Sequence, residues 1–276
     1  MMKPHLTALA LGLAVLWGAP SAAENRFLGS EGELLPFDED ALLSFLENAS
    51  VVESEEVAGG IGRTLKVLLE QDGIRAHAAF RTIDRKVKKT ILSGETYLDF
   101  HDSYIYEVAA YRLSRLLEID MVPPAVLRSI DGEAGSIQLW IPDAMTDAKR
   151  RSEKLEAPDK AAWYEQEQTK RLFDRLIYNY DRHANNVLIA DWRLWLIDHT
   201  RSFRLSTNMP GLKEVTGCSR GLYQRLQTMD QELVRRELKP VIGGARTRAV
   251  FKRRAKVVKH CESLAQNLGE DNAFFD

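Results

Sequence analysis

The stretch DRHANNVLIADWRLWLID, from Asp181 to Asp198, decides the fold expected of this chain. Two apolar runs, residues 187–190 and 193–197, predict short strands joined by a tight turn. This hairpin returns Asp198 to the neighbourhood of Asn186. Upstream, apolar side chains at helical spacing predict an amphipathic helix that ends at the polar loop; they are Leu172, Phe173, Leu176, Ile177 and Tyr180. The sequence therefore predicts that a helix, a loop and a hairpin bring two acids and an amide together.

Two acids and an amide at this spacing are the groups that phosphoryl transfer uses. One Asp orients the attacking hydroxyl, while an Asn and a second Asp hold magnesium against the phosphates. In the kinase signature four residues separate the first Asp from the Asn, and the second Asp follows a later strand. Asp181, Asn186 and Asp198 keep this interval and order. We therefore predict a catalytic role for Asp181 and metal binding by Asn186 and Asp198.

The order Asp-Arg-His, followed by two residues and the Asn, resembles the phosphoinositide kinases and the secretory-pathway kinases of the Golgi casein-kinase type. The resemblance implies an α+β, two-lobed protein-kinase-like fold, with a small antiparallel sheet lobe carrying one helix and a mainly helical C-terminal lobe. It implies ATP and Mg²⁺ (or Mn²⁺) as cofactors, and it makes Arg182 and His183 the supporting pair of Asp181. The alternative is a solvated polar turn between a helix and a hairpin.

The first half of the chain predicts the sheet lobe. Five segments are typical of strands: residues 51–57, 63–70, 74–83, 126–130 and 136–141. Asp72-Gly73 and Asp131-Gly132 are strong hairpin signals between neighbouring segments. The segments therefore predict a sheet of five strands ahead of the helical half.

Phosphate-binding residues are expected on this sheet. A glycine turn precedes the second strand and would let backbone N–H groups approach phosphate: Gly59, Gly60 and Gly62. A plain hairpin is the alternative for this turn. A period of two places Ala79 and Arg81 on one face of the third strand. The resemblance implies that Ala79 covers the adenine and that Arg81 replaces the usual lysine, unless Lys66 on the neighbouring strand does so.

An acid is expected on the helix that follows the third strand. Residues 104–118 carry an apolar stripe at helical spacing, with Asp102 or Ser103 available to cap the start. Glu107 lies off that stripe. The resemblance implies that Glu107 turns toward Arg81 and holds it against the phosphates. The alternative is an ordinary exposed glutamate.

The N-terminus indicates export. Lys3 precedes an apolar run over residues 6–17, and small residues follow at 21–23, which predicts a signal peptide over residues 1–23. We expect a secreted or periplasmic protein after cleavage; an uncleaved membrane anchor is the weaker alternative. The remaining boundaries are a helical extension over residues 24–50, in which Asp38 caps a helix, a sheet lobe over 51–141 and a helical lobe over 142–276. Helices are expected at residues 219–238 and 247–268 of that lobe. In an oxidising compartment its two cysteines, Cys218 and Cys261, could form a disulfide or stay as buried thiols.

Composition limits the partners. The 276 residues include 38 basic and 40 acidic side chains, for a net charge of −2, which gives no sign of nonspecific nucleic-acid binding. No Cys or His spacing suggests a structural zinc site. The basic run over residues 246–259 is expected to be the solvated face of a helix. The expected partners are a nucleotide and a hydroxyl acceptor, which could be a protein, a glycan or a lipid; the oligomeric state stays open.

The predicted function is that of an exported kinase. A pseudokinase, acting as a nucleotide-binding or scaffold domain without turnover, is the alternative that Arg81 and the imperfect glycine turn favour. Replacement of the usual Phe-Gly after Asp198 by His199-Thr200 puts switching of an activation segment in doubt. A metal-dependent hydrolase built on the same carboxylates is a third interpretation, which lacks a His cluster or an extra acid in the sequence nearby.

Overall fold

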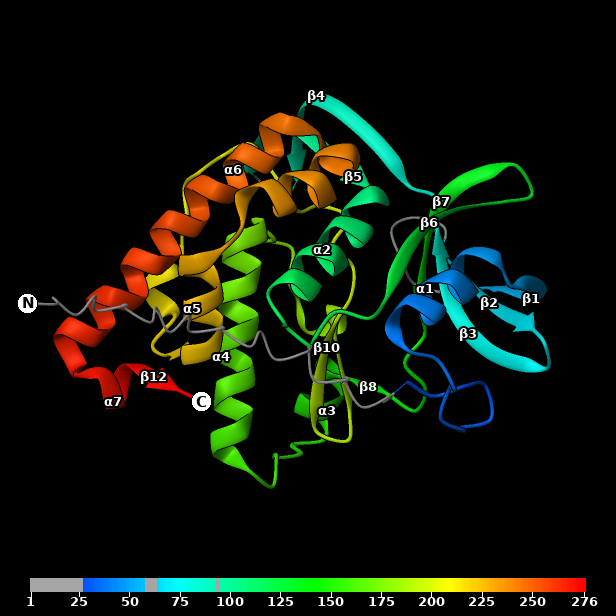
Figure 1. Cartoon of the computed structure of the whole chain (residues 1–276), viewed down its shortest axis with the longest axis horizontal. Helices are drawn as coiled ribbons and strands as arrows, with labels where there is room; N and C mark the ends of the chain where they lie inside the picture. Colours follow the sequence, from blue (N-terminus) through cyan, green and yellow to red (C-terminus); the bar gives the residue numbers. More distant parts are fainter. Residues whose placement is uncertain (1–26, 58–63, 93–94) are drawn as a thin grey trace, which may run out of the picture.

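A sheet lobe and a helical lobe lie side by side in the computed structural model, which describes residues 27–57, 64–92 and 95–276 (Figure 1). The sheet lobe holds a five-stranded antiparallel sheet with the order β1-β2-β3-β7-β6. Its strands are β1 (Ser50–Glu56), β2 (Thr64–Gln71), β3 (Ile74–Arg81), β6 (Ala125–Ile130) and β7 (Glu133–Leu139). The five strands predicted from the sequence are thus confirmed. The predicted Gly59, Gly60 and Gly62 turn lies outside the described residues.

Turn chemistry and one helix explain the sheet lobe. Asp72 and Gly73 both have positive φ, 55° and 79°, as a tight β2–β3 hairpin turn requires. Helix α1 (Glu39–Asn48) packs on the sheet and buries Leu42, Phe45 and Leu46 against apolar strand residues. The Asp38 carboxylate accepts a hydrogen bond from the Ala41 amide at 2.8 Å, which confirms the predicted helix cap.

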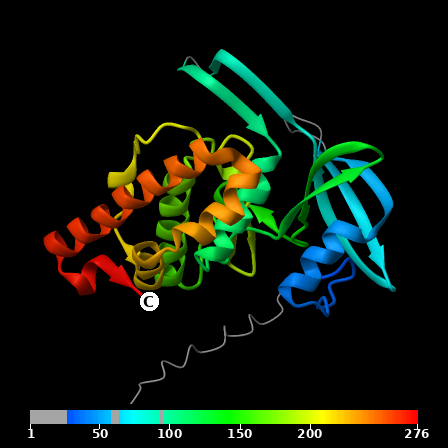
Figure 2. The same ribbon diagram turned by 45° about the horizontal axis from the view of Figure 1, so that its top comes forward.

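A long hairpin separates β3 from the next helix and was missed by the sequence analysis. Strands β4 (Asp84–Leu92) and β5 (Glu95–Ser103) form a separate two-stranded sheet and project from the body of the protein (Figure 2). Charged side chains dominate β4, so no alternation of apolar and polar residues marks it as a strand.

Helix α2 (Ile105–Leu116) follows the β4–β5 hairpin directly and lies between the two lobes (Figure 1). The predicted cap by Asp102 or Ser103 is wrong, because Tyr104 occupies the cap position and makes no side-chain cap bond. The Ser103 hydroxyl instead donates to Asp84 at 2.7 Å, and Asp102 pairs with an arginine in the cleft. Both side chains therefore bind tertiary partners and do not cap the helix.

The helical lobe forms around a second apolar core. Its elements are β8 (Met145–Thr146), α3 (Asp147–Ser152), α4 (Lys160–Ile177), the 3₁₀ turn η1 (Ala184–Asn186), β9 (Val187–Ala190), β10 (Arg193–Leu196), the 3₁₀ turn η2 (Leu212–Glu214), β11 (Cys218–Ser219), α5 (Arg220–Thr228), α6 (Gln231–Leu268), α7 (Glu270–Ala273) and β12 (Phe274–Phe275). Helix α4 buries Leu172, Phe173, Leu176 and Ile177, as predicted. It ends where Tyr178 turns left-handed at φ 59°, so the predicted inclusion of Tyr180 is wrong. None of the helices in the described ranges combines the length and apolarity needed to cross a membrane.

The C-terminal helices differ from the expectation in two ways. The expected helix over residues 219–238 is broken between α5 and α6, and α6 then continues to Leu268 with a bend at Gly243, where φ is 77°. Arg253, predicted to lie on a solvated face, is fully buried. Its guanidinium donates hydrogen bonds to backbone carbonyl oxygens of three loop and helix-end residues, Leu176, Arg204 and Ser206.

A disulfide ties the helical lobe together. Cys218 on β11 and Cys261 on α6 are both buried and bonded, with their Cα atoms 6.1 Å apart. Of the two states left open by the sequence, the structure has the disulfide. The bond links segments 43 residues apart in the chain.

Candidate active site

Six of the predicted site residues line a cavity of 530 Å³ between the lobes, while Arg182 and Glu107 are not part of its lining. Its walls come from the sheet lobe, from the connection between the lobes and from the helical lobe; the residues used below are Ala79, Arg81, Asp102, Asp181, His183, Asn186, Asp198, Thr200 and Arg201. This volume falls within the range of ligand pockets, about 300–1,000 Å³. A larger cavity of 860 Å³ is lined by Trp140, Trp192 and Trp195, but by none of the predicted site residues.

The loop after α4 is held by Arg182. Its guanidinium pairs with the buried Asp174 of α4 at 3.1 Å and donates to the carbonyl oxygen of Asn186 at 2.6 Å and to that of Ile197. The Ile197 amide in turn donates to the Asn186 carbonyl at 3.2 Å. Arg182 therefore fastens helix, loop and hairpin in one arrangement, which places Asn186 next to the strand that leads to Asp198.

His183 does not join Arg182 in this support. Its side chain is exposed at the cavity wall and makes no hydrogen bond within the described part of the chain. The Asn186 amide group donates to the backbone oxygen of Asp181, at 3.4 Å. The supporting role expected of the pair thus falls to Arg182 alone, since only its side chain bridges the flanking elements.

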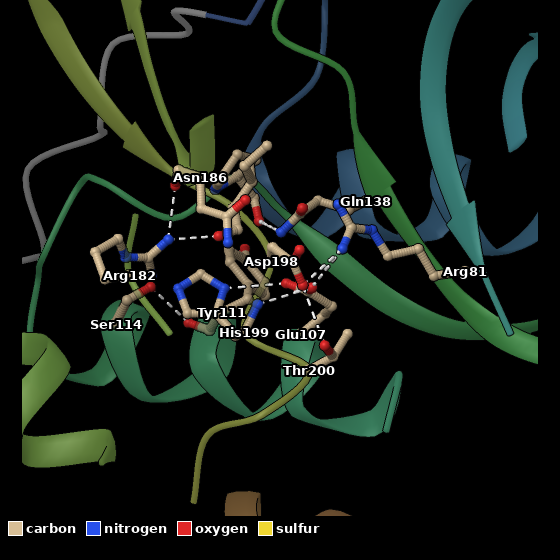
Figure 3. Close-up of polar contacts among 12 residues, drawn as sticks. Arg81, Glu107, Tyr111, Ser114, Gln138, Arg182, Asn186, Asp198, His199 and Thr200 are labelled. Atoms are coloured by element: carbon tan, nitrogen blue, oxygen red, sulfur yellow. Dashed lines mark hydrogen bonds and ion pairs between the residues drawn. The ribbon is translucent and has the colours of Figure 1, made fainter. Parts of the chain in front are cut away.

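Glu107 on α2 contacts both His199 and Arg81. Its fully buried carboxylate accepts hydrogen bonds from the His199 amide at 2.9 Å and the His199 ring at 3.0 Å, and it lies 3.4 Å from the Arg81 guanidinium (Figure 3). A carboxylate only accepts, so His199 Nδ1 carries the proton in this contact. The alternative of an exposed glutamate is therefore wrong, and the Arg81–Glu107 pair is present.

Arg81 also contacts the predicted metal ligand Asp198, at 3.0 Å. Burial disfavours the charge on Arg81, but Glu107 and Asp198 outweigh it and raise the pKa of the guanidinium above its ordinary value. Burial likewise opposes ionisation of Asp198, and the Arg81 charge, with a hydrogen bond donated by Thr200 at 3.1 Å, lowers the pKa of Asp198 below its ordinary value. Both groups are therefore held charged in the cleft.

Arg81, and not Lys66, lines the cavity. Arg81 and Ala79 lie on one face of β3 and both line the cavity, as the period of two predicted. The Lys66 ammonium lies 3.2 Å from Glu55 and 5.4 Å from the centre of the Trp140 ring. Its charge is thus engaged by Glu55 of the neighbouring strand β1.

Two further residues of the cleft escaped the sequence analysis. Arg201 forms ion pairs of 2.8 Å with both Asp102 and Asp181. Asp102 is buried at the end of β5, where the sequence analysis considered it only as a helix cap. A basic residue three positions after the second metal-ligand candidate was a visible signal for Arg201, whereas nothing local marked Asp102.

The side chains fit a magnesium or manganese ion. Asn186 and Asp198 offer one amide oxygen and one carboxylate, the hard ligands that these ions prefer. Mg²⁺ is commonly held by one or two carboxylates and completed by substrate phosphates. Within the described ranges, no three His, Cys, Asp or Glu side chains form a ready metal cluster.

Solved structures share this architecture, although no protein-family model and no curated protein sequence matches the chain. Hydra Fam20 with sugar superposes with a TM-score of 0.65 at 17% identity, over 88% of this chain and 94% of that one. The chain has the fold of an atypical kinase. The Golgi casein kinase with Mn/ADP bound gives 0.60 at 16% identity, over 86% of this chain and 78% of that one. The Helicobacter pylori proinflammatory kinase CtkA gives 0.51 at 8% identity, over 81% and 98%. The predicted kinase-like fold and its likeness to secretory-pathway kinases are confirmed.

Proposed function

We propose that this protein is an exported kinase that transfers the γ-phosphate of ATP to a hydroxyl group of a protein, glycan or lipid. The observation that carries the proposal is the convergence of Asp181, Asn186, Asp198 and Arg81 on one cavity between the lobes, with Glu107 paired to Arg81 behind it. A solvated polar turn would not bury Asn186 or place these residues around a cavity. Mn/ADP binding by a Golgi casein kinase of the same fold supports a nucleotide and a divalent ion as cofactors.

The residues have separable tasks in this reaction. Asp181 would accept the proton of the acceptor hydroxyl. The hydroxyl oxygen then bonds to the γ-phosphorus, and the bond between that phosphorus and the oxygen of the leaving ADP breaks. Arg81, held by Glu107, would bind phosphate oxygens with its planar fork, which suits phosphate as well as carboxylate. Asn186 and Asp198 would hold the divalent ion, which neutralises charge on the phosphates.

Export is part of the proposal. The N-terminal pattern of a basic residue, an apolar run and small residues supports a cleaved signal peptide. The Cys218–Cys261 disulfide supports the same location, because such bonds persist in oxidising compartments. Detection of the mature N-terminus after residue 23, by mass spectrometry of the exported protein, would test this part.

A pseudokinase is the second candidate, and one contact favours it. Arg81 pairs with Asp198 at 3.0 Å, so the carboxylate proposed to bind metal is partly engaged by the residue proposed to bind phosphate. A protein that keeps this pair would bind nucleotide weakly or without turnover. Binding and transfer must therefore be measured separately.

The test uses nucleotide binding and phosphate transfer on the same protein. Thermal shift with MgATP or MnATP reports binding, and transfer from γ-labelled ATP to protein, glycan and lipid fractions reports activity. Asp181→Ala and Asp198→Ala should each lower transfer by about 10²-fold or more. Asp191→Asn is the matched control, because Asp191 lies on the same hairpin outside this cavity and Asn tolerates its φ of 48°. Transfer that survives both alanine changes would refute the kinase assignment, and binding without any transfer would favour the pseudokinase.

A further inference from the structure

We propose that Arg201 is the cation that orients Asp181 and stabilises the phosphoryl group during its transfer. This assignment rests on the proposed function and extends it, because Arg182 of the kinase motif and Arg81 both pair with acids other than Asp181. It makes Arg201 an arginine acting in cis on the acceptor side of the cleft.

The geometry fixes where this charge lies. Nε of Arg201 contacts Asp102 at 2.8 Å, and Nη1 contacts Asp181 at 2.8 Å. The guanidinium also lies 5.7 Å from the centre of the Phe100 ring, which is buried at the base of the β4–β5 hairpin. A ring on one side and two carboxylates at the edges leave the planar group little freedom to rotate. Arg201 is thus held in place before any ligand binds.

One edge of this guanidinium is still open for a ligand. Arg201 lines the cavity, its side chain is 19% exposed, and Nη2 makes no hydrogen bond within the described part of the chain. An arginine carries five N–H donors, so its contacts with Asp102 and Asp181 do not exhaust them. The free donors lie next to Asp181, where an acceptor hydroxyl and the γ-phosphoryl group would meet.

Arg81 and Arg182 are engaged elsewhere. Arg81 contacts Glu107 and Asp198, and Arg182 contacts Asp174 and backbone carbonyls of the loop. Without Arg201, the carboxylates of Asp102 and Asp181 would face a phosphoryl group that is itself negative. Coulomb repulsion in a partly buried cleft is several times stronger than in water, so a fixed cation there lowers the barrier to transfer.

Arg201 takes no proton in the step that follows. The acceptor hydroxyl loses its proton to Asp181, its oxygen bonds to the γ-phosphorus, and the bond between that phosphorus and the ADP oxygen breaks. Arg201 donates hydrogen bonds to an oxygen of the moving phosphoryl group and to Asp181 throughout. Burial disfavours its charge, but Asp102 and Asp181 outweigh burial and raise the pKa of the guanidinium, so it stays protonated.

In the competing interpretation Arg201 has a purely structural role, because it also joins β5 to the catalytic loop through Asp102 and Asp181. The two interpretations differ in what a variant loses. If Arg201 has a structural role, its removal should lower stability and nucleotide affinity together. If it acts on the phosphoryl group, its removal should lower kcat and leave nucleotide binding nearly intact.

The experiment compares Arg201→Ala and Arg201→Lys with the native protein in transfer, MgATP binding and thermal unfolding. We expect Arg201→Ala to lower kcat by about 10²–10³-fold, with the nucleotide Kd changed by less than about threefold. Arg201→Lys keeps the charge but loses the fork, so it should recover less than about one tenth of the native kcat. Asp102→Asn, which loosens Arg201 without removing it, should lower kcat less than Arg201→Ala does.

Chemical rescue separates the two interpretations most clearly. Guanidinium chloride at about 50 mM, far below denaturing concentrations, should raise the kcat of Arg201→Ala by at least about tenfold. Sodium chloride at equal ionic strength should not, and Asp181→Ala should gain nothing from guanidinium. A kcat of Arg201→Ala within about threefold of native, or a loss that guanidinium does not recover, would overturn the role of Arg201 alone. A native protein that transfers no phosphate would refute the proposed function, and this role with it.

Discussion

Glu107 is the buried side chain whose removal should disturb the cleft most. Its carboxylate accepts from the His199 amide at 2.9 Å and the His199 ring at 3.0 Å, and it lies 3.4 Å from Arg81. Glu107→Ala leaves two buried donors unsatisfied, each at a cost of about 1–3 kcal/mol. Arg81 keeps its ion pair with Asp198 at 3.0 Å, so loss of the Arg81–Glu107 ion pair should add only a small further cost in unfolding free energy. The expected total is about 3–5 kcal/mol of unfolding free energy.

Glu107→Gln is the milder change at the same position. The amide keeps the shape and one acceptor oxygen, but its NH₂ group must face either the His199 ring donor or the Arg81 guanidinium. We expect a loss of about 2 kcal/mol for this variant, smaller than the loss for alanine. It should also lower the affinity for MgATP, because Arg81 loses the negative charge that holds it.

Urea unfolding followed by tryptophan fluorescence measures these losses, with the slope of the transition compared between variants. Glu55→Ala is the matched control, because Glu55 also forms an ion pair, 3.2 Å from Lys66, but its side chain is 70% exposed. Exposed pairs contribute little, so the control should lose less than about 1 kcal/mol. The reasoning about Glu107 would be refuted if Glu107→Ala lost no more than the Glu55 control.

Two further predictions concern the helical lobe. Replacing Cys218 and Cys261 together by Ser should lower the unfolding free energy by about 4 kcal/mol, because the bond closes a loop of 43 residues in the unfolded chain. An unfolding midpoint that dithiothreitol does not change would contradict it. Arg253→Met should cost about 2–4 kcal/mol in urea, because three backbone carbonyls lose their donor although a buried charge is also removed. Its control is the exposed Arg236→Met, and equal midpoints for the two variants would count against a structural role for Arg253.

Local sequence signals determined much of the element structure. Asp-Gly pairs at residues 72–73 and 131–132 marked two hairpins, because their backbone adopts positive φ at low cost. The β4–β5 hairpin stayed hidden, because charged side chains dominate β4 and leave no apolar alternation there. The break between α5 and α6 was also missed: it falls at Met229, where φ is −49° and ψ is 117°, within a stretch of continuous helical periodicity.

The sequence by itself determined the candidate loop and hairpin, because Asp181, Asn186 and Asp198 lie within a single stretch whose spacing alone brings them close. The Arg81–Glu107 pair was expected only through a resemblance. Tertiary structure alone decided that Glu107 is buried and that Arg201 joins Asp181 to Asp102, although Asp102 precedes Arg201 by 99 residues in the chain. Burial and long-range ion pairs depend on which elements pack together, and no local pattern of residues determines that packing.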